Sequence, residues 1–165
     1  MSQTVLITGT SSGFGKLMTK TLLVKGHKVV ASMRDPREKN KASADELGKL
    51  GNDDNLLIVD LDVTNDKSVD SAVAAALEKF GNIDALVNNA GVGTGGITEG
   101  FTPEQFTQLM NVNVSGLYRV TRAVLPTMRE KGSGLIINIS SVMGRIVIPF
   151  ATAYTASNFA VEGYT

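Results

Sequence analysis

A glycine-rich segment, Thr-Gly-Thr-Ser-Ser-Gly-Phe-Gly, runs from Thr8 to Gly15 directly after a short apolar run. Gly9 permits a tight turn, Gly13 lets the backbone approach a pyrophosphate, and Gly15 allows a helix to pack closely on a strand. The unpaired N–H groups and the positive dipole end of that helix would face the phosphates. A glycine-rich turn without a ligand is the alternative, but this context favours phosphate binding. The candidate cofactor-binding residues here are Gly9, Ser11, Ser12, Gly13, Phe14 and Gly15.

The residues after the second apolar run bear on which dinucleotide would bind. An acidic residue there would bind the ribose 2′-hydroxyl of NAD, whereas an arginine would favour the 2′-phosphate of NADP. Met33 stands where the acid is expected, and Arg34 follows it. An arginine can stack on adenine while it pairs with phosphate. We therefore predict NADP(H) in preference to NAD(H). The alternative is that Arg34 and Asp35 form a solvated charge pair that binds nothing.

Strand-length apolar runs alternate with helical patterns along the chain. The predicted strands cover 5–7, 29–31, 56–59, 85–87 and 135–139. The predicted helices start at Phe14, within 36–50, at Asp66, after Thr102 and near Ala153. Thr102 and Gln105 form a capping box around Pro103, and that helix is expected to run to about Lys131.

Alternating strands and helices imply right-handed crossovers and a parallel sheet with helices on both faces. We predict an α/β fold: a Rossmann-like, doubly wound parallel sheet in a three-layer αβα arrangement. Residues 1–165 form a single domain, without a repeat or linker. Ligands bind such sheets beyond the carboxyl ends of the strands, so functional residues should follow strands.

The composition excludes several classes of function. The formal net charge is zero, so the chain lacks the electrostatic footprint of a nucleic-acid or anionic-membrane binder. No apolar run approaches the ~18 residues of a membrane helix, and no targeting segment is visible. The chain has no Cys and only one His, His27, so we predict no metal site. These features favour a cytoplasmic protein with a small-molecule partner.

Several segments together resemble the short-chain dehydrogenases/reductases, in order and at that family's spacing over nearly the whole chain. Thr8–Gly15 resembles the TGxxxGxG signature. The other matches are Asp62-Val63, the NNAG motif Asn88–Gly91, the segment Asn111–Gly116 with Asn113, and Asn138–Ser141 followed by Tyr154 thirteen residues after Ser141. The sequence around Arg34 and Tyr154 is most similar to that of the hydroxysteroid and retinol dehydrogenase-like branch.

The resemblance implies an oxidoreductase that transfers a hydride between NADP(H) and a hydroxyl/carbonyl substrate. Tyr154 would protonate the developing alkoxide, and its phenolate would be the base in reverse. Ser141 would hydrogen-bond the substrate oxygen and hold it near Tyr154. Asn113 would hold a proton-relay water. A capping serine, a core tyrosine and a satisfied helix asparagine are the alternative interpretations of these residues.

The same resemblance implies further cofactor contacts and an assembly. Asp62 and its neighbour Val63 would contact the adenine. Asn88, Ala90 and Gly91 would shape the ribose and nicotinamide side of the cofactor site. The long helix after Thr102 and the helix near Ala153 form the usual dimer face of the family, so a homo-oligomer is expected.

The active-site motif of the family is Y-x-x-x-K, but this chain has Asn158 in the lysine position. In the family that lysine binds the nicotinamide ribose and electrostatically favours the phenolate, a form that is scarce at neutral pH without such help. Asn158 can hydrogen-bond a ribose but carries no charge. No lysine follows Lys131, and Arg145, on the loop after Ser141, is the one cation that could approach instead. Turnover is therefore expected to be weakened or absent. A natural pseudoenzyme, an engineered knock-out and a tolerated variant all fit this substitution.

Members of the family continue beyond residue 165 with two more strands and a substrate-covering loop. The expected fold therefore lacks the last strands of the family, and no particular substrate is predicted. An uncovered sheet edge would favour association or instability. An active NADP(H)-dependent oxidoreductase is the favoured interpretation. The alternatives are a catalytically silent dinucleotide-binding module, as a sensor or partner subunit, and a phosphate-binding α/β domain without a dinucleotide.

Overall fold

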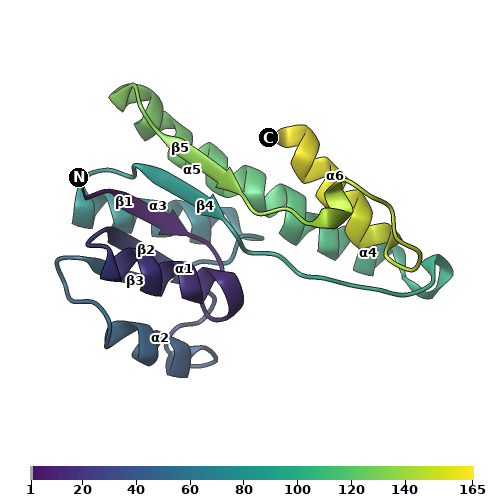
Figure 1. The fold of residues 1–165 in the computed structure, drawn as a ribbon, viewed down its shortest axis with the longest axis horizontal. Coiled ribbons are helices and arrows are strands. Elements are labelled where there is room, and N and C mark those ends of the chain that lie inside the picture. The colour runs from purple at the N-terminus through teal and green to yellow at the C-terminus, as the bar shows by residue number, and fades with distance from the viewer. Residues whose placement is uncertain (1) are drawn as a thin grey trace.

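The computed structural model describes residues 2–165 and contains a parallel sheet of five strands between helical layers (Figure 1). The strands are β1 (Thr4–Ile7), β2 (Lys28–Met33), β3 (Leu56–Asp60), β4 (Ala85–Asn88) and β5 (Leu135–Asn138). Their order in the sheet is β3-β2-β1-β4-β5, and every neighbouring pair is parallel. The strand order reverses beside β1, at the start of the chain. The predicted Rossmann-like α/β fold is confirmed.

The helices follow the predicted order, with differences at their ends. They are α1 (Gly13–Val24), α2 (Lys41–Gly48), α3 (Asp66–Phe80), α4 (Pro103–Met110), α5 (Gly116–Lys131) and α6 (Thr152–Tyr164). Short 3-10 turns η1 (Thr98–Gly100) and η3 (Val142–Gly144) and a π-helical segment η2 (Asn111–Ser115) complete the elements. The surface helix predicted within 36–50 is limited to α2, because residues 36–40 form a turn.

Two apolar clusters fill the space between the sheet and its helices. Successive strand side chains point to opposite faces, so Leu6 packs toward α3 and α5, whereas its neighbours Val5 and Ile7 pack toward α1 and α2. Leu6 and Ile7 have no exposed surface. Burying each such side chain contributes about 1.5–3 kcal/mol, so both faces of the sheet stabilise the fold.

Helix α3 begins at Asp66, as predicted, and both of its ends are specified locally. The side chain of Asn65 accepts a hydrogen bond from the N–H of Ser68 at 3.0 Å and caps the first turn. Gly81 ends the helix in the left-handed conformation, with φ of 79°. The capping box of Thr102 and Gln105 on α4 is likewise confirmed.

The single helix expected from Thr102 to about Lys131 is wrong in one respect. The π-helical segment η2 divides it into α4 and α5. A π turn accommodates one extra residue per turn and is often found at functional sites. It lies opposite the loop after β3, where a Cβ on Gly116 would come within 2.7 Å of the side chain of Val63.

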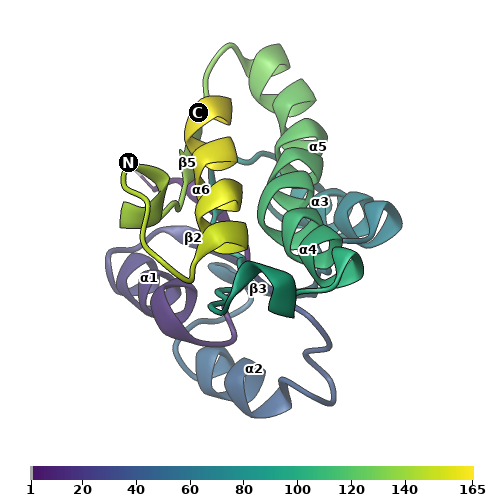
Figure 2. The same ribbon diagram turned by 90° about the vertical axis from the view of Figure 1, so that its right-hand side faces the viewer.

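Helix α6 lies beyond the carboxyl ends of the strands, where ligands bind in such folds (Figures 1 and 2). It packs on α4, on the π-helical segment η2 and on η3. The helix therefore forms one side of the region that the predicted catalytic residues share. No helix within residues 2–165 is both long and apolar enough to cross a bilayer.

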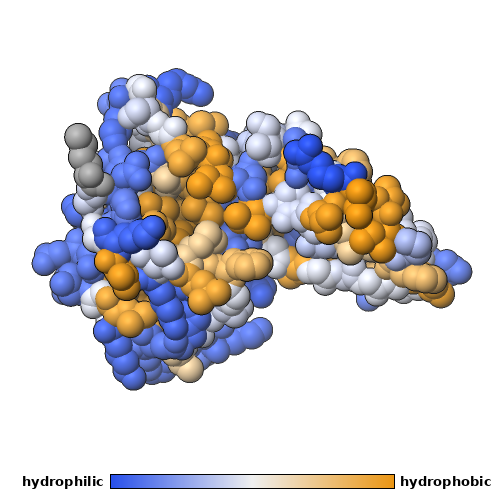
Figure 3. All heavy atoms as spheres, in the orientation of Figure 1, coloured by the Kyte–Doolittle hydropathy of each residue, from blue (hydrophilic) through white to orange (hydrophobic). Residues whose placement is uncertain are grey.

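Strand β5 forms one edge of the sheet and leaves apolar side chains accessible. Leu135 and Ile137 of this strand are 51% and 41% exposed. Further exposed apolar residues lie on the loop before α6, and both groups are visible as orange areas in Figure 3. The expected uncovered edge is thus present in the part of the chain that the structure describes.

Asp84, just before β4, ties the sheet to the end of α5. Its carboxylate accepts hydrogen bonds from the Thr4 N–H and the Asn82 side chain, each at 2.8 Å, and forms an ion pair with Lys131. Burial alone would raise the pKa of Asp84, but the bonds from Lys131, Thr4 and Asn82 outweigh it and hold the pKa below its usual value. The ionised carboxylate therefore stabilises the folded chain.

Asp84→Asn is expected to lower the free energy of unfolding by about 1 kcal/mol at pH 7, since the carboxylate is partly exposed. Because the folded pKa is depressed, this contribution is complete above the unfolded value of 3.8 and disappears as the pH falls below it. Urea unfolding of both proteins at pH 7 and pH 3 measures the difference. A difference that stays the same at both pH values would contradict this role of Asp84.

Candidate functional site

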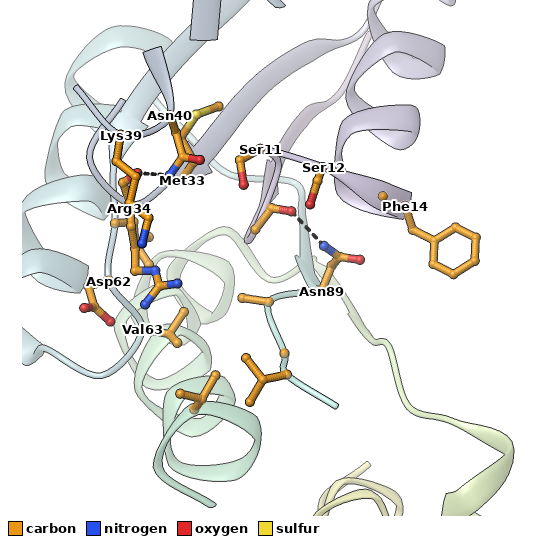
Figure 4. A pocket seen from close by; sticks show the side chains of 17 residues that line it. Ser11, Ser12, Phe14, Met33, Arg34, Lys39, Asn40, Asp62, Val63 and Asn89 are labelled. Carbon is orange, nitrogen blue, oxygen red and sulfur yellow. Dashed lines mark hydrogen bonds between the residues drawn. The ribbon is translucent and has the colours of Figure 1, made fainter. Parts of the chain in front are cut away.

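A cleft of about 380 Å³ lies at the carboxyl ends of the central strands (Figure 4). It gathers the glycine-rich turn, the end of β2, the loop after β3 and the loop after β4. Ten of the twelve predicted cofactor-binding residues line it. These are Gly9, Ser11, Ser12, Gly13, Phe14, Arg34, Asp62, Val63, Ala90 and Gly91. The sequence positions of these residues are far apart, so the strand topology brings them together.

The floor of the cleft is built by close backbone contacts of the glycine-rich turn. Gly9 has φ of +73°, and a Cβ on it would lie 2.9 Å from the Cα of Ala90. A Cβ on Gly15 would overlap the carbonyl oxygen of Gly9 and lie 2.6 Å from the side-chain nitrogen of Asn89. Gly15 thus lies beneath the cleft and not on its wall. Both glycines are required for the turn to pack against the loop after β4.

Thr8 and Asn89 connect this turn to the loop after β4. The hydroxyl of Thr8 accepts the N–H groups of Asn89 and Ala90 at 3.0 and 2.9 Å. The side chain of Asn89 donates to the carbonyl oxygens of Thr8 and Gly9 at 2.8 and 3.1 Å, and Figure 4 shows the bond to Gly9. These bonds fix the two loops that would hold a dinucleotide. Neither residue was among the predicted site residues, although Asn89 lies within the NNAG motif.

The first turn of α1 offers donors to an anion. Ser12 is the N-cap residue, yet its side chain makes no capping hydrogen bond. The first N–H groups of a helix have no partner within it, and the helix dipole adds a partial positive charge there. Ser11, Ser12 and Gly13 line the cleft at this end, whereas the ring of Phe14 projects away from it (Figure 4). A phosphate would therefore find donors here.

The end of β2 brings Arg34 to the cleft and turns Asp35 away from it. Arg34 lines the cleft, but Asp35 does not. The carboxylate of Asp35 accepts the N–H groups of Glu38 and Lys39, each at 3.2 Å. No ion pair joins Arg34 and Asp35 within residues 2–165. Arg34 and Asp35 therefore do not pair with each other, and the binding of a phosphate by Arg34 stays a prediction.

Asp62, after β3, carries the acidic group of the cleft. Burial alone would raise the pKa of Asp62, but hydrogen bonds from the Thr64 N–H and hydroxyl and the charges of Arg34 and Arg119 lower it overall. The two bonds measure 2.9 and 2.7 Å. Asp62 is thus an ionised, fixed acceptor at neutral pH, as a contact to the amino group of an adenine requires.

Asn88 lies beneath the cleft and does not line it. Its side chain is 4% exposed and donates to Thr121 at 3.0 Å and to Asn138 at 2.9 Å. These bonds join β4 to α5 and to β5. The predicted contact of Asn88 with the cofactor is therefore not reproduced by the position of its side chain, which supports the sheet instead.

Asn113 of the π-helical segment connects the loop after β4 to α6. Its side chain exchanges two hydrogen bonds with the backbone of Val92, both at 2.9 Å, and donates to the hydroxyl of Ser157 at 3.0 Å. The amide hydrogens of Asn113 are both used, and one acceptor position of its oxygen remains. Asn113 therefore positions α6. A water could bind to Asn113 only by donating a hydrogen bond to its side-chain oxygen.

Ser141 and Tyr154 flank the region between β5 and α6. The hydroxyl oxygen of Ser141 accepts the N–H of Met143 at 3.2 Å, so Ser141 caps η3. Accepting this bond leaves the hydroxyl proton of Ser141 free to donate to another group. Tyr154 lies half-buried in the first turn of α6. The capping interpretation of Ser141 is correct, and it is compatible with the catalytic one.

Asn158 directs its amide into α6 itself. The residue is 5% exposed, and its side-chain nitrogen donates to the carbonyl oxygen of Tyr154 at 2.8 Å. Arg145 does not replace the missing lysine, because its guanidinium pairs with Glu162 at 2.7 Å. Glu162 lies eight residues after Tyr154, about 12 Å along the helix. No ion pair of the described residues thus places a cation in the helical turn that contains Tyr154.

Lys39 and Asn40 also line the cleft, and the sequence analysis missed both. They lie in the charged segment after β2, which has no periodicity from which their orientation could be read. The Asp35-Pro36 pair is a sequence signal for a turn there, but it does not say which of the following side chains faces the cleft. The described residues contain no group of three or more His, Asp and Glu side chains placed to hold a metal ion.

The doubly wound sheet and the glycine-lined cleft at its carboxyl edge define a dinucleotide-binding protein of the Rossmann type. The sequence matches the short chain dehydrogenase family (adh_short) over residues 3–165. The chain belongs to this family.

Individual relatives agree with this assignment. The chain is 44% identical over 163 residues to a 3-ketodihydrosphingosine reductase of Bacteroides thetaiotaomicron, covering 99% of this chain and 56% of that protein. An actinorhodin polyketide ketoreductase with NADPH superposes with a TM-score of 0.91 at 34% identity, over 99% of this chain and 62% of that one. A 3-ketoacyl-(acyl-carrier-protein) reductase from Brucella melitensis with NADH gives a TM-score of 0.89 at 39% identity, over 99% and 67%. The chain spans about half the length of the curated relatives that it matches.

Proposed function

We propose that this chain is the cofactor-binding and catalytic part of an NADP(H)-dependent oxidoreductase that interconverts a carbonyl and a hydroxyl group. The observation that carries the proposal is the cleft itself. It combines a glycine turn whose close contacts leave no room for a Cβ at Gly9 or Gly15 with unpaired helix N–H groups. Such a cradle fits a pyrophosphate. Two structural neighbours are described with NADPH and with NADH, which supports a nicotinamide dinucleotide here.

The choice of NADP(H) over NAD(H) rests on the charges around the end of β2. An NAD-type site needs a carboxylate that faces the ribose hydroxyls. Met33 stands in that place, and the carboxylate of Asp35 is occupied by two backbone N–H groups. Arg34 lines the cleft and is available to a 2′-phosphate.

The catalytic roles that we propose use groups of this chain. A bound nicotinamide would supply or accept the hydride. Tyr154 would donate its hydroxyl proton to the carbonyl oxygen as negative charge develops there. Ser141 would donate its remaining hydroxyl proton to the same oxygen and orient it. Asn113 would act by holding α6 against the loop after β4. Because Asn158 brings no charge to Tyr154, we expect slow turnover, and slower oxidation than reduction.

The substrate class that we propose is a ketone or its alcohol. The relatives described above are named as reductases of keto groups, which supports this class. A narrower assignment, to the hydroxysteroid and retinol dehydrogenase-like branch, rests on the sequence around Arg34 and Tyr154 and stays a prediction. A cytoplasmic location and a homo-oligomer also stay predictions.

NADPH oxidation against a panel of ketones, aldehydes and steroids tests the activity. We expect a slow, substrate-dependent loss of absorbance at the nicotinamide band that exceeds the rate with NADH. Tyr154→Phe is the matched control, since it removes only the hydroxyl that donates the proton, and it should abolish the signal. Cofactor binding without turnover of any carbonyl would favour the silent module. Equal rates for the protein and Tyr154→Phe would contradict the proposed role of Tyr154.

A further inference from the structure

We propose that Lys39 is a second ligand of the 2′-phosphate of the cofactor and that the turn at residues 35–40 exists to present it. This inference rests on the proposed function, since it assigns the residue that would complete NADP(H) selection. Three charged side chains line the cleft: Arg34, Lys39 and Asp62. Arg34 and Lys39 lie on the same side of the cleft in Figure 4.

The turn that carries Lys39 is held at both of its ends. At its start, the Asp35 carboxylate accepts the N–H groups of Glu38 and Lys39, and the Asp35 N–H donates to Asp60 at 2.9 Å. At its end, Asn40 donates its N–H to the carbonyl oxygen of Asp35 at 2.9 Å and its side-chain nitrogen to that of Arg34. The backbone of Lys39 is thus fixed beside the cleft before any ligand arrives.

Asp35 has φ of +48°, which is uncommon for a residue with a side chain. This conformation turns its carboxylate back over the following residues, where it caps the turn. Asp35, the acidic residue that directly follows Arg34, therefore does not line the cleft. We infer that Asp35 is a positioning residue for Lys39 and not a ligand of a ribose.

The charges of the cleft favour an anion at this position. Neither Arg34 nor Lys39 forms an ion pair with any carboxylate in the described chain. By contrast, the neighbouring Lys41 pairs with Asp45 at 2.6 Å and lies outside the cleft. The charge of Arg34 also acts on Asp62, the one carboxylate of the described residues that lines the cleft, but it forms no ion pair with it. Two cations that share one wall and form no ion pair would bind a phosphate dianion together, through charge-assisted hydrogen bonds. Asn40 adds a neutral polar group to the same wall.

The test compares the affinities of Lys39→Ala and the unmodified protein for NADPH, NADH, 2′,5′-ADP and 5′-ADP by equilibrium titration. We expect Lys39→Ala to lower the affinities for NADPH and 2′,5′-ADP about tenfold and to leave those for NADH and 5′-ADP unchanged. Lys39→Arg should restore most of the loss. Lys41→Ala, which removes a lysine two positions later, is the control and should change none of these affinities.

Two results would overturn the inference. If the unmodified protein prefers NADPH and Lys39→Ala keeps that preference, Lys39 is not a ligand and the proposed cofactor stands. If the unmodified protein binds NADH as tightly as NADPH, both the cofactor preference and the role of Lys39 are wrong.

Asp35→Gly tests the turn, because glycine keeps the positive φ and removes the cap. We expect it to lower the ratio of NADPH to NADH affinity, since Lys39 is no longer held. A higher ratio would show that the Asp35 carboxylate opposes the phosphate from within the site, which would contradict its positioning role.

Discussion

Replacing Asn158 by lysine is expected to raise the rate of carbonyl reduction by about 10²-fold, the usual scale for a general acid–base group made effective. Asn158 lies one helical turn after Tyr154 and uses its amide on the Tyr154 carbonyl oxygen. A lysine there would bring a positive charge next to the phenol and favour its ionised form. The gain should be larger for alcohol oxidation than for ketone reduction, because only oxidation needs the phenolate as a base.

Steady-state rates with NADPH and a reactive ketone, and with NADP and its alcohol, measure this change. Asn158→Gln is the matched control, since it lengthens the side chain without adding charge and should give no gain. Adding Tyr154→Phe to Asn158→Lys should remove the gain. Because Asn158 is buried, thermal unfolding must accompany the rates. A folded Asn158→Lys protein with unchanged rates would show that Asn158 does not limit turnover.

Gly15→Ala is expected to abolish NADPH binding or folding. A methyl group at Gly15 would overlap the carbonyl oxygen of Gly9 and press on the side chain of Asn89, so the whole glycine turn must move. Overpacking of this kind costs about 1–3 kcal/mol, and it displaces the backbone that would cradle the pyrophosphate. NADPH affinity should fall at least about tenfold.

Titration with NADPH and thermal unfolding together measure this effect. Gly48→Ala is the control, because Gly48 is helical and a Cβ there meets no atom within 4 Å. That change should leave binding intact and raise stability slightly, since alanine favours a helix over glycine. Unchanged NADPH affinity in a folded Gly15→Ala protein would show that the cofactor does not use the glycine turn.

The sheet and most helix ends could be predicted because local chemistry specifies them. The strands are short β-branched runs, and α3 begins at a capping asparagine and ends at a glycine with positive φ. The π-helical segment could not be predicted, because the Asn, Val and Ser residues of Asn111–Ser115 are mildly unfavourable in any helix and do not indicate a π turn in particular. Within this segment Asn113 makes tertiary hydrogen bonds to Val92 and Ser157, and the sequence alone does not reveal such contacts.

The sequence predicts most of the residues that line the cleft, whereas the roles of the neighbouring catalytic residues stay predictions. The glycines of the cleft and Arg34 follow strands, and parallel strands bring such residues to one edge. Lys39 was missed because its place depends on the unusual backbone of Asp35. Asn88 lies beneath the cleft, and a sequence motif does not say to which side of a strand end a side chain points, so its contact with the cofactor stays a prediction. The motif spacing identifies Asn158, but its hydrogen bond to the Tyr154 carbonyl oxygen depends on the rotamer that it adopts in the folded chain.

Equilibrium titration of the unmodified protein with NADPH, followed by the fluorescence of its reduced nicotinamide, tests the central claim most directly. The signal does not depend on turnover, so slow catalysis cannot hide it. We expect saturable binding, one dinucleotide per chain, with NADH bound more weakly. If neither NADPH nor NADH saturates the protein at about 1 mM, the cleft is not a dinucleotide site and the assignment is contradicted. A Kd of that size corresponds to only ~4 kcal/mol of binding free energy.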